Sequence, residues 1–141
     1  MCFSAGASFG AGVVLSFIGI ASVRKSHHSS QVLFASIPLI FGVQQFSEGI
    51  LWLTLPNPDY LGIQRVFTYV FLLFAQIIWP VWVPIAVIQF EKKATRNDIQ
   101  KVFVAAGIII STYLAYCLLS YHVESSIIGY HISYKQDYPS A

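Results

Sequence analysis

The stretch VLFASIPLIFGVQQFSEGILWLTL, residues Val32–Leu55, decides the fold class of this chain. It is longer than the roughly 20 predominantly apolar residues that a membrane-spanning helix needs. Glu48 is the only charged residue inside any of the chain's long hydrophobic stretches. A carboxylate at the bilayer centre costs about 2.5–3.5 kcal/mol on insertion scales, and such residues usually face a protein interior or a watery cavity. Glu48 is therefore the first candidate for a working site.

Three further stretches share this apolar character, and the composition of the whole chain agrees with them. Charged residues make up 10% of the 141 residues and apolar residues 56%, whereas about 25% of a soluble domain is charged. Backbone polar groups in lipid must be paired within the protein, which favours helices. The sequence predicts an all-α integral membrane bundle, a single domain over residues 1–141. It has four transmembrane helices with short loops at about Ala5–Val23, Val32–Leu55, Val66–Phe90 and Val102–Tyr121, and a polar tail, His122–Ala141.

The basic residues predict the orientation of these helices. The first and third connections hold six of them (Arg24, Lys25, Lys92, Lys93, Arg96 and Lys101), and the other side holds only Arg65 and Lys135. Connections rich in Lys and Arg stay in the cytoplasm, so both termini are expected outside, N-out and C-out. A nucleic-acid partner is not expected, because the sequence has no basic face with stacking aromatic residues. The expected partner is the lipid bilayer.

Small residues recur at helical spacing in the first stretch. Ser8, Gly12, Ser16 and Gly19 fall on one face, which allows another helix backbone to approach closely. Close helix packing is the favoured interpretation, and a homo-oligomer through this face is one form of it. A groove that admits a substrate chain is the alternative.

The third stretch contains W-P-V-W-V-P, residues Trp79–Pro84. Each proline removes one helix hydrogen bond, which frees the carbonyls of Gln76 and Pro80. The favoured interpretation is a kink whose freed carbonyls are satisfied by neighbours or water. The alternative is a broken helix whose carbonyls bind an ion, as in some transporters.

Glutamines accompany Glu48 at a similar depth. Gln44 and Gln45 precede it by four and three residues and share its helix face. Gln76 on the third helix is expected at the depth of both. These three glutamines predict a hydrogen-bonded cluster that fixes helix packing, with a ligand- or cofactor-binding role as the alternative.

Glu48 itself has two chemical interpretations. Either it is protonated, because a low dielectric disfavours the charged form, or it faces a cation, a metal or trapped water. Carboxylate, imidazole and thiolate are ligands of zinc and other transition metals, although no local signature such as C-x-x-C is present. Candidate catalytic residues on the outer side are Glu48, His131 and Cys2, and candidate metal ligands are these three with His122. Cys2 would gain a free amine beside its thiol if Met1 were removed.

Alternation marks the polar tail. Apolar side chains at Tyr130, Ile132 and Tyr134 alternate with polar ones at 131, 133 and 135. The pattern predicts a short extended segment over the helix ends, with a frayed tail as the alternative.

Four motifs together resemble one family. They are M-C-F-S-A-G-A-S-F (Met1–Phe9), F-G-V-Q-Q-F-S-E-G-I-L-W (Phe41–Trp52), W-P-V-W-V-P (Trp79–Pro84) and H-I-S-Y (His131–Tyr134). They are similar to motifs of small bacterial membrane proteins classed as a domain of unknown function, DUF6629. The resemblance implies a multi-pass protein of the bacterial inner (plasma) membrane, without an established activity. It singles out Cys2, Gln45, Glu48, Trp52 and His131.

Three classes of function fit these features. The first is a membrane-embedded enzyme or metal-binding protein with an outward-facing metal or proton site at Glu48 and His131. The second is a small proton- or cation-coupled transporter or channel subunit. The third is a structural or accessory subunit whose polar residues only fix helix packing.

Overall fold

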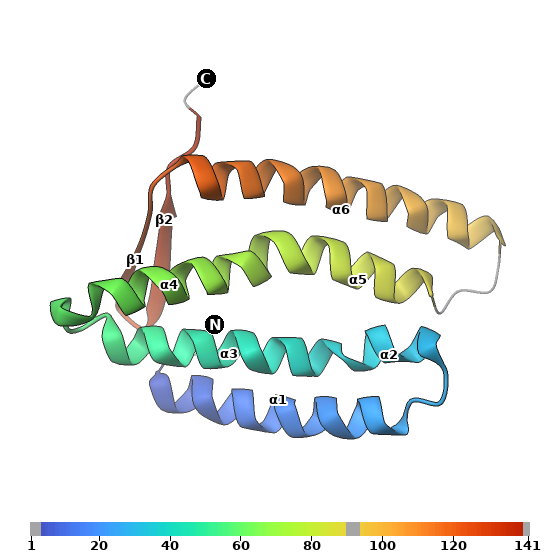
Figure 1. Ribbon diagram of the computed structural model, residues 1–141, viewed down its shortest axis with the longest axis horizontal. Coiled ribbons are helices and arrows are strands. Elements are labelled where there is room, and N and C mark those ends of the chain that lie inside the picture. The colour runs from blue at the N-terminus through green and yellow to red at the C-terminus, as the bar shows by residue number, and fades with distance from the viewer. Residues whose placement is uncertain (1–3, 90–93, 140–141) are drawn as a thin grey trace.

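A computed structural model describes residues 4–89 and 94–139, and it is built mainly of helices (Figure 1). Four long helical segments follow one another, which confirms the predicted all-α fold. A small β-hairpin, β1–β2, completes the described chain. The helical segments are α1 (Ala5–Lys25), α2 with α3 (Ser29–Ala35 and Ile37–Thr54), α4 with η2 and α5 (Leu61–Leu72, Leu73–Ile78 and Trp79–Ile88), and α6 (Ala94–Ser120).

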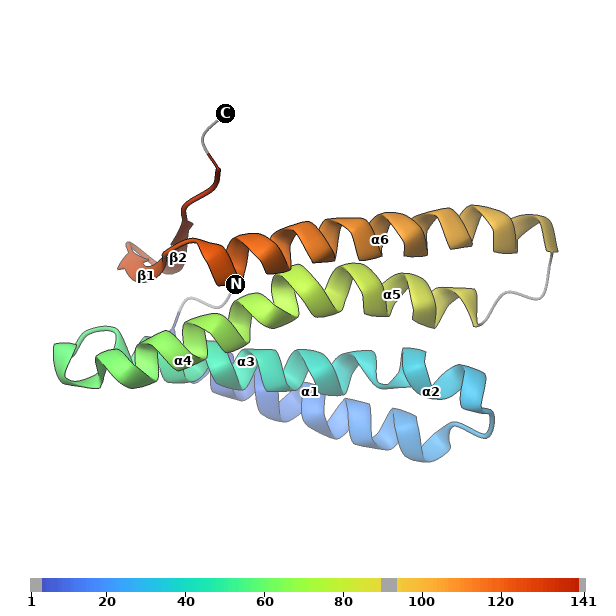
Figure 2. The ribbon, with the colours of Figure 1, turned by 45° about the horizontal axis from the view of Figure 1, so that its top comes forward.

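The four segments form a row in sequence order (Figures 1 and 2). Extensive contacts join α1 to α3, α3 to α4, and α5 to α6. The two helices at the ends of the row, α1 and α6, expose large apolar side chains such as Phe17, Ile109 and Leu119. Extended apolar surfaces of this kind mark contact with another apolar phase. Lipid is the environment that suits them.

Three described helical segments are long and apolar enough to cross a membrane. They are Ala5–Lys25, Pro58–Ile88 and Asp98–Ser120. Helix α3 is not among them; its 18 residues include Gln44, Gln45 and Glu48. The polar residues that single out α3 as a possible site also lower the mean hydropathy of its 18 residues.

The second predicted helix is broken where the sequence suggested continuity. Helix α2 ends at Ala35 and α3 begins at Ile37, because Pro38 in the first turn of α3 cannot donate a backbone hydrogen bond. At this break the carbonyl of Leu33 accepts hydrogen bonds from Ser36 Oγ at 2.7 Å and Trp82 Nε1 at 3.2 Å. Hydropathy alone could not show this break, because both sides of it are apolar.

Two predicted boundaries are corrected outward. The third segment was expected to begin at Val66, but η1 (Pro58–Tyr60) leads directly into α4, so Arg65 lies in the helix and not in a loop. The fourth begins at Ala94, eight residues before Val102. Polar residues continue α6 beyond its apolar stretch, and the end predicted at Phe90 falls outside the described residues.

The small-residue face of α1 packs against α3 within the chain. A Cβ added at Gly12 would lie 3.2 Å from the Phe46 ring, and one at Gly19 would lie 2.7 Å from Leu39 Cβ. The close packing predicted for this face is therefore found inside one molecule. A homo-oligomer through the same face would require α3 to leave it.

The polar tail forms an antiparallel hairpin, β1 (Val123–Ile128) and β2 (His131–Gln136). Gly129 opens the two-residue turn with φ of 61°, and Tyr130 has no positive φ. Glycine at the first turn position is the requirement of a type II′ hairpin turn. The extended segment predicted from the alternation is thus present, with a second strand that the alternation did not indicate.

One face of the hairpin packs on the helices. Side chains alternate between the faces of a strand, and Ile132 and Val123 on the inner face are 1% and 7% exposed. They join the hydrophobic core around Leu51, Phe71 and Leu118. The hairpin therefore closes the end of the row where α3 ends and α4 begins (Figure 1).

Neighbouring groups accommodate the proline-rich third segment. The stretch before Trp79 is π-helical, and Pro84 lies inside α5. Ser111 Oγ on α6 donates to the Ile77 carbonyl at 3.1 Å, and Gly107 lies against the Pro80 carbonyl. The Ile77 carbonyl is not one of the two that the prolines were expected to free. The favoured interpretation, a kink whose freed Gln76 and Pro80 carbonyls are satisfied by neighbours or water, therefore stays a prediction.

Candidate functional site

Glu48 is completely buried in the C-terminal half of α3, at 0% exposure. Gln44, one turn earlier, and Leu51, one turn later, are buried on the same helix face. Leu51 belongs to the core that also holds Phe71 of α4 and Ile132 of the hairpin. Glu48 therefore lies in the protein interior, on the side of α3 that faces α4 and the hairpin.

Tyr134 is the hairpin residue that reaches toward this carboxyl group. Its ring stacks on Phe71 at 4.7 Å with an interplanar angle of 5°. Burial raises the pKa of the Tyr134 hydroxyl, and the charge of Glu48 raises it further. Tyr134 therefore lies close enough to Glu48 for a negative charge on that carboxyl group to disfavour ionisation of the hydroxyl.

The pKa of Tyr134 predicts a loss of stability in alkali. Because its folded-state pKa is raised above the ordinary value of 10.0, the unfolded chain releases the phenolic proton first as the pH rises. Stability is therefore intact below pH 10 and falls above it. Thermal unfolding in detergent between about pH 9 and 11 should show a smaller loss for Tyr134→Phe than for wild type.

Tyr130→Phe is the matched control for this titration, because Tyr130 lies on the same hairpin and is 79% exposed. It should lose stability with pH as the wild-type protein does. Equal alkaline losses in all three proteins would contradict the burial argument.

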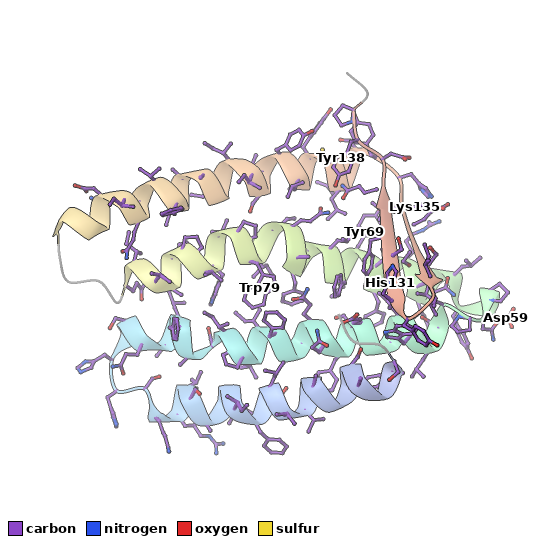
Figure 3. All side chains as sticks on the ribbon, turned by 180° about the vertical axis from the view of Figure 1, so that it is seen from behind. Asp59, Tyr69, Trp79, His131, Lys135 and Tyr138 are labelled. Atoms are coloured by element: carbon purple, nitrogen blue, oxygen red, sulfur yellow. The ribbon has the colours of Figure 1, made fainter. Side chains whose placement is uncertain are left out.

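Hydrogen bonds from glutamines join the elements around Glu48. Gln44 Oε1 accepts from Trp79 Nε1 at 2.6 Å, and Trp79 lies between α3 and α5 (Figure 3). Gln76 Nε2 donates to Gln136 Oε1 at 2.6 Å, which ties η2 to the hairpin. Gln44 and Gln76 thus each form a link to another element, and Gln45 is buried in α3 at 8% exposure.

Several buried polar atoms of this region have spare hydrogen-bonding capacity. Tyr134 Oη, Gln76 Oε1 and Gln136 Nε2 have no hydrogen-bond partner within residues 4–89 and 94–139. Such groups are costly in an apolar interior, and ordered water commonly satisfies them. These three atoms are therefore the polar groups of the helix–hairpin interface that could accept a further hydrogen-bond partner.

The structure places the predicted histidine ligands away from this interior. The register pairs Ile128 with His131 and Ile127 with Ile132, so His131 lies on the hairpin face opposite Ile132 and Tyr134. His131 is exposed near the hairpin tip (Figure 3). His122 is also exposed and contacts Glu124, Nε2 to Oε1, at 3.2 Å. Cys2 lies outside the described residues.

The described part of the chain therefore does not gather the proposed metal ligands around Glu48. No group of three or more His, Cys, Asp or Glu side chains suited to a metal ion occurs among those residues. The metal site and the catalytic roles of Glu48, His131 and Cys2 stay predictions.

Sequence reasoning missed Tyr134, Gln136 and Trp79 as neighbours of the polar cluster. The alternation in the tail did place Tyr134 on the same strand face as Ile132. It could not show that this face turns toward Glu48, because that depends on where the hairpin crosses the helices.

Comparison with known proteins gives a family and no activity. One family model, described as a family of unknown function (DUF6629), matches residues 1–141. Neither a curated protein nor a solved structure matches significantly. Any assignment of function therefore depends on the site geometry.

Proposed function

We propose, on the premise that this chain belongs to the DUF6629 family of unknown function, that it is a multi-pass membrane protein with a proton-binding site at Glu48. The observation that carries the proposal is the complete burial of the Glu48 side chain, which is 0% exposed. The bacterial plasma membrane is the proposed location, with the ends of α1 and α2 that meet near Lys25 in the cytoplasm.

Four passes through the membrane are part of this proposal. Helix α3 is flanked by α1 on one side and by the α4–α5 segment on the other, and both neighbours are long and apolar enough to span. Its 18 residues correspond to about 27 Å at 1.5 Å per residue, close to the roughly 30 Å hydrocarbon core. A helix between two spanning helices shares their depth, and its neighbours cover its polar residues.

Burial supports proton binding over a permanent charge. An ionised carboxylate is costly in an apolar interior, and a neutral carboxyl group is much less so. The proton is released when a neighbouring dipole or water stabilises the charged form. Tyr134, whose buried hydroxyl responds to charge at Glu48, supplies one such dipole.

The hairpin supports an outward-facing site. Tyr134 and Gln136 lie on its inner strand face and contact the helices, whereas His131 and Lys135 lie on its outer face. Protons that reach Glu48 from the outer side would have to cross the hairpin, and its polar inner side chains would lie along their path. Because the four helices form an open row, a closed pathway across the membrane would need a further copy or partner.

Infrared spectroscopy of Glu48→Gln tests the proton site directly. A protonated carboxyl group has a carbonyl band that is distinct from the carboxylate bands. We expect wild-type protein at neutral pH to show this band and Glu48→Gln to lose it, because the amide replaces the only carboxyl group in the long apolar stretches.

Glu124→Gln is the matched control, since Glu124 is an exposed carboxyl group on the hairpin. It should keep the band. Absence of the band in wild type, or its persistence in Glu48→Gln, would exclude a protonated Glu48. Metal analysis of the same preparations addresses the metal alternative, because a metal bound at Glu48 would be lost with the substitution.

A further inference from the structure

A cavity lies away from Glu48, at the end of the row where α1 meets α2. Its volume is about 490 Å³, and most of its lining is apolar. Phe34, Ala35, Ile37 and Pro38 form the apolar wall at the break between α2 and α3. The recess therefore lies at the break between the two helices.

A cation and several polar side chains stand at this recess. Lys25 lines it in the last turn of α1, and its side chain is exposed. Ser22, Ser26 and Gln31 also line it. Their positions are partly fixed, since Ser26 Oγ donates to the Ser22 carbonyl at 3.0 Å and Gln31 Oε1 accepts from His27 N at 3.3 Å. The Gln31 amide nitrogen keeps its donor capacity.

We infer that this recess binds an anionic phospholipid of the cytoplasmic leaflet, with the phosphate beside Lys25 and the first part of an acyl chain against Phe34 and Pro38. The chemistry of the lining matches both halves of such a lipid. Basic pockets between membrane helices on the cytoplasmic side commonly hold anionic headgroups. A volume of about 490 Å³ accommodates part of a lipid and leaves the remaining chain in the bilayer.

The expected position of the recess along the membrane normal also fits an anionic phospholipid. The recess lies at the end of α1 that carries Arg24 and Lys25, which the charge distribution places at the cytoplasmic surface. Headgroups meet acyl chains at that depth. A basic side chain beside an apolar recess therefore lies where an anionic lipid presents its phosphate and its upper acyl chain.

Native mass spectrometry of the full chain tests the inference. The probes are phosphatidylglycerol and phosphatidylcholine with identical acyl chains, added to the detergent-purified protein. We expect more bound phosphatidylglycerol than phosphatidylcholine, and about a fivefold lower affinity for phosphatidylglycerol in Lys25→Gln. Glycerol phosphate, which lacks acyl chains, should not compete at equal concentration.

Two variants separate the recess from surface charge in general. Lys101→Gln removes the same charge on the same predicted side, but Lys101 pairs with Asp98 at 2.9 Å and does not line the recess. It should bind phosphatidylglycerol as wild type does. Ala35→Leu adds apolar volume to the recess without changing charge and should weaken binding of both lipids.

Specific results would overturn the inference. Equal weakening by Lys25→Gln and Lys101→Gln would show general attraction to a basic surface. Unchanged binding in both Lys25→Gln and Ala35→Leu would exclude the recess. Competition by glycerol phosphate would show a phosphate site and no lipid site. None of these results depends on protonation of Glu48.

Discussion

Gly107→Ala should separate α6 from α5 and cost about 3 kcal/mol or more of unfolding free energy, at or above the upper end of ordinary overpacking. A Cβ at this position would collide with the Pro80 carbonyl oxygen and lie 2.9 Å from its carbon. Both atoms are backbone, so no side-chain rotation relieves the collision. Thermal unfolding in detergent, followed by tryptophan fluorescence, measures the loss.

The chemistry of Pro84 explains why the helices meet so closely at this point. A proline has no N–H, so Pro84 leaves the Pro80 carbonyl without its usual helical donor. The backbone of Gly107 approaches that carbonyl, at a distance that only a residue without a side chain allows. Substitution at Gly107 therefore affects the same place where the third segment is distorted.

Gly10→Ala is the matched control for Gly107→Ala. Gly10 is also helical, but an added Cβ there would meet nothing within 4 Å. Alanine is the better helix former by about 0.5–1 kcal/mol, so Gly10→Ala should keep or raise stability. Similar stability of the two variants would show that α6 does not pack against Pro80 as described.

Ile132→Ala should be the second large effect, with a loss of about 2–5 kcal/mol. Ile132 is 1% exposed and packs with Leu51, Phe71 and Leu118. Removing its side chain leaves a cavity between the hairpin and the helices, which loosens the cover over Glu48. Chemical unfolding in detergent measures the stability, and hydrogen exchange of hairpin amides reports the loosening.

Ile128→Ala removes the same atoms from the same hairpin, where Ile128 is 48% exposed. It should cost much less than Ile132→Ala, because its side chain is already largely outside the core. If the two substitutions cost the same, the hairpin does not pack on the helices through its inner face. The infrared band of Glu48 would then also lack the protected environment proposed for it.

Much of the fold followed from local properties of the sequence. Long apolar stretches predicted four helical segments, and small residues predicted a closely packed face on α1, because helix formation and close approach depend on nearby residues. The break at Ser36 and the extension of α6 to Ala94 did not follow. Apolar character alone does not show that the helix breaks just before Pro38. It also does not show how far polar residues extend α6 toward its N-terminus.

The candidate site was predictable in part. Glu48 stood out because a charge in an apolar stretch must be managed wherever the chain folds. Gln44 and Gln76 were expected to join one cluster with Gln45, whereas the structure pairs Gln44 with Trp79 and Gln76 with Gln136. Those partners lie far away in the sequence. Helical spacing predicts only which residues of one helix share a face, so it could not identify them.

The sequence by itself determined that this is an apolar helical protein of the membrane with one carboxyl group inside its long apolar stretches. Apolar character and helix formation depend on many neighbouring residues together, so small errors in the predicted helix boundaries do not change either conclusion. Only the tertiary structure decided that Tyr134, and not His131, turns toward Glu48. A one-residue change of register exchanges the two faces of a strand, so this choice rests on how the hairpin packs against α3 and α4.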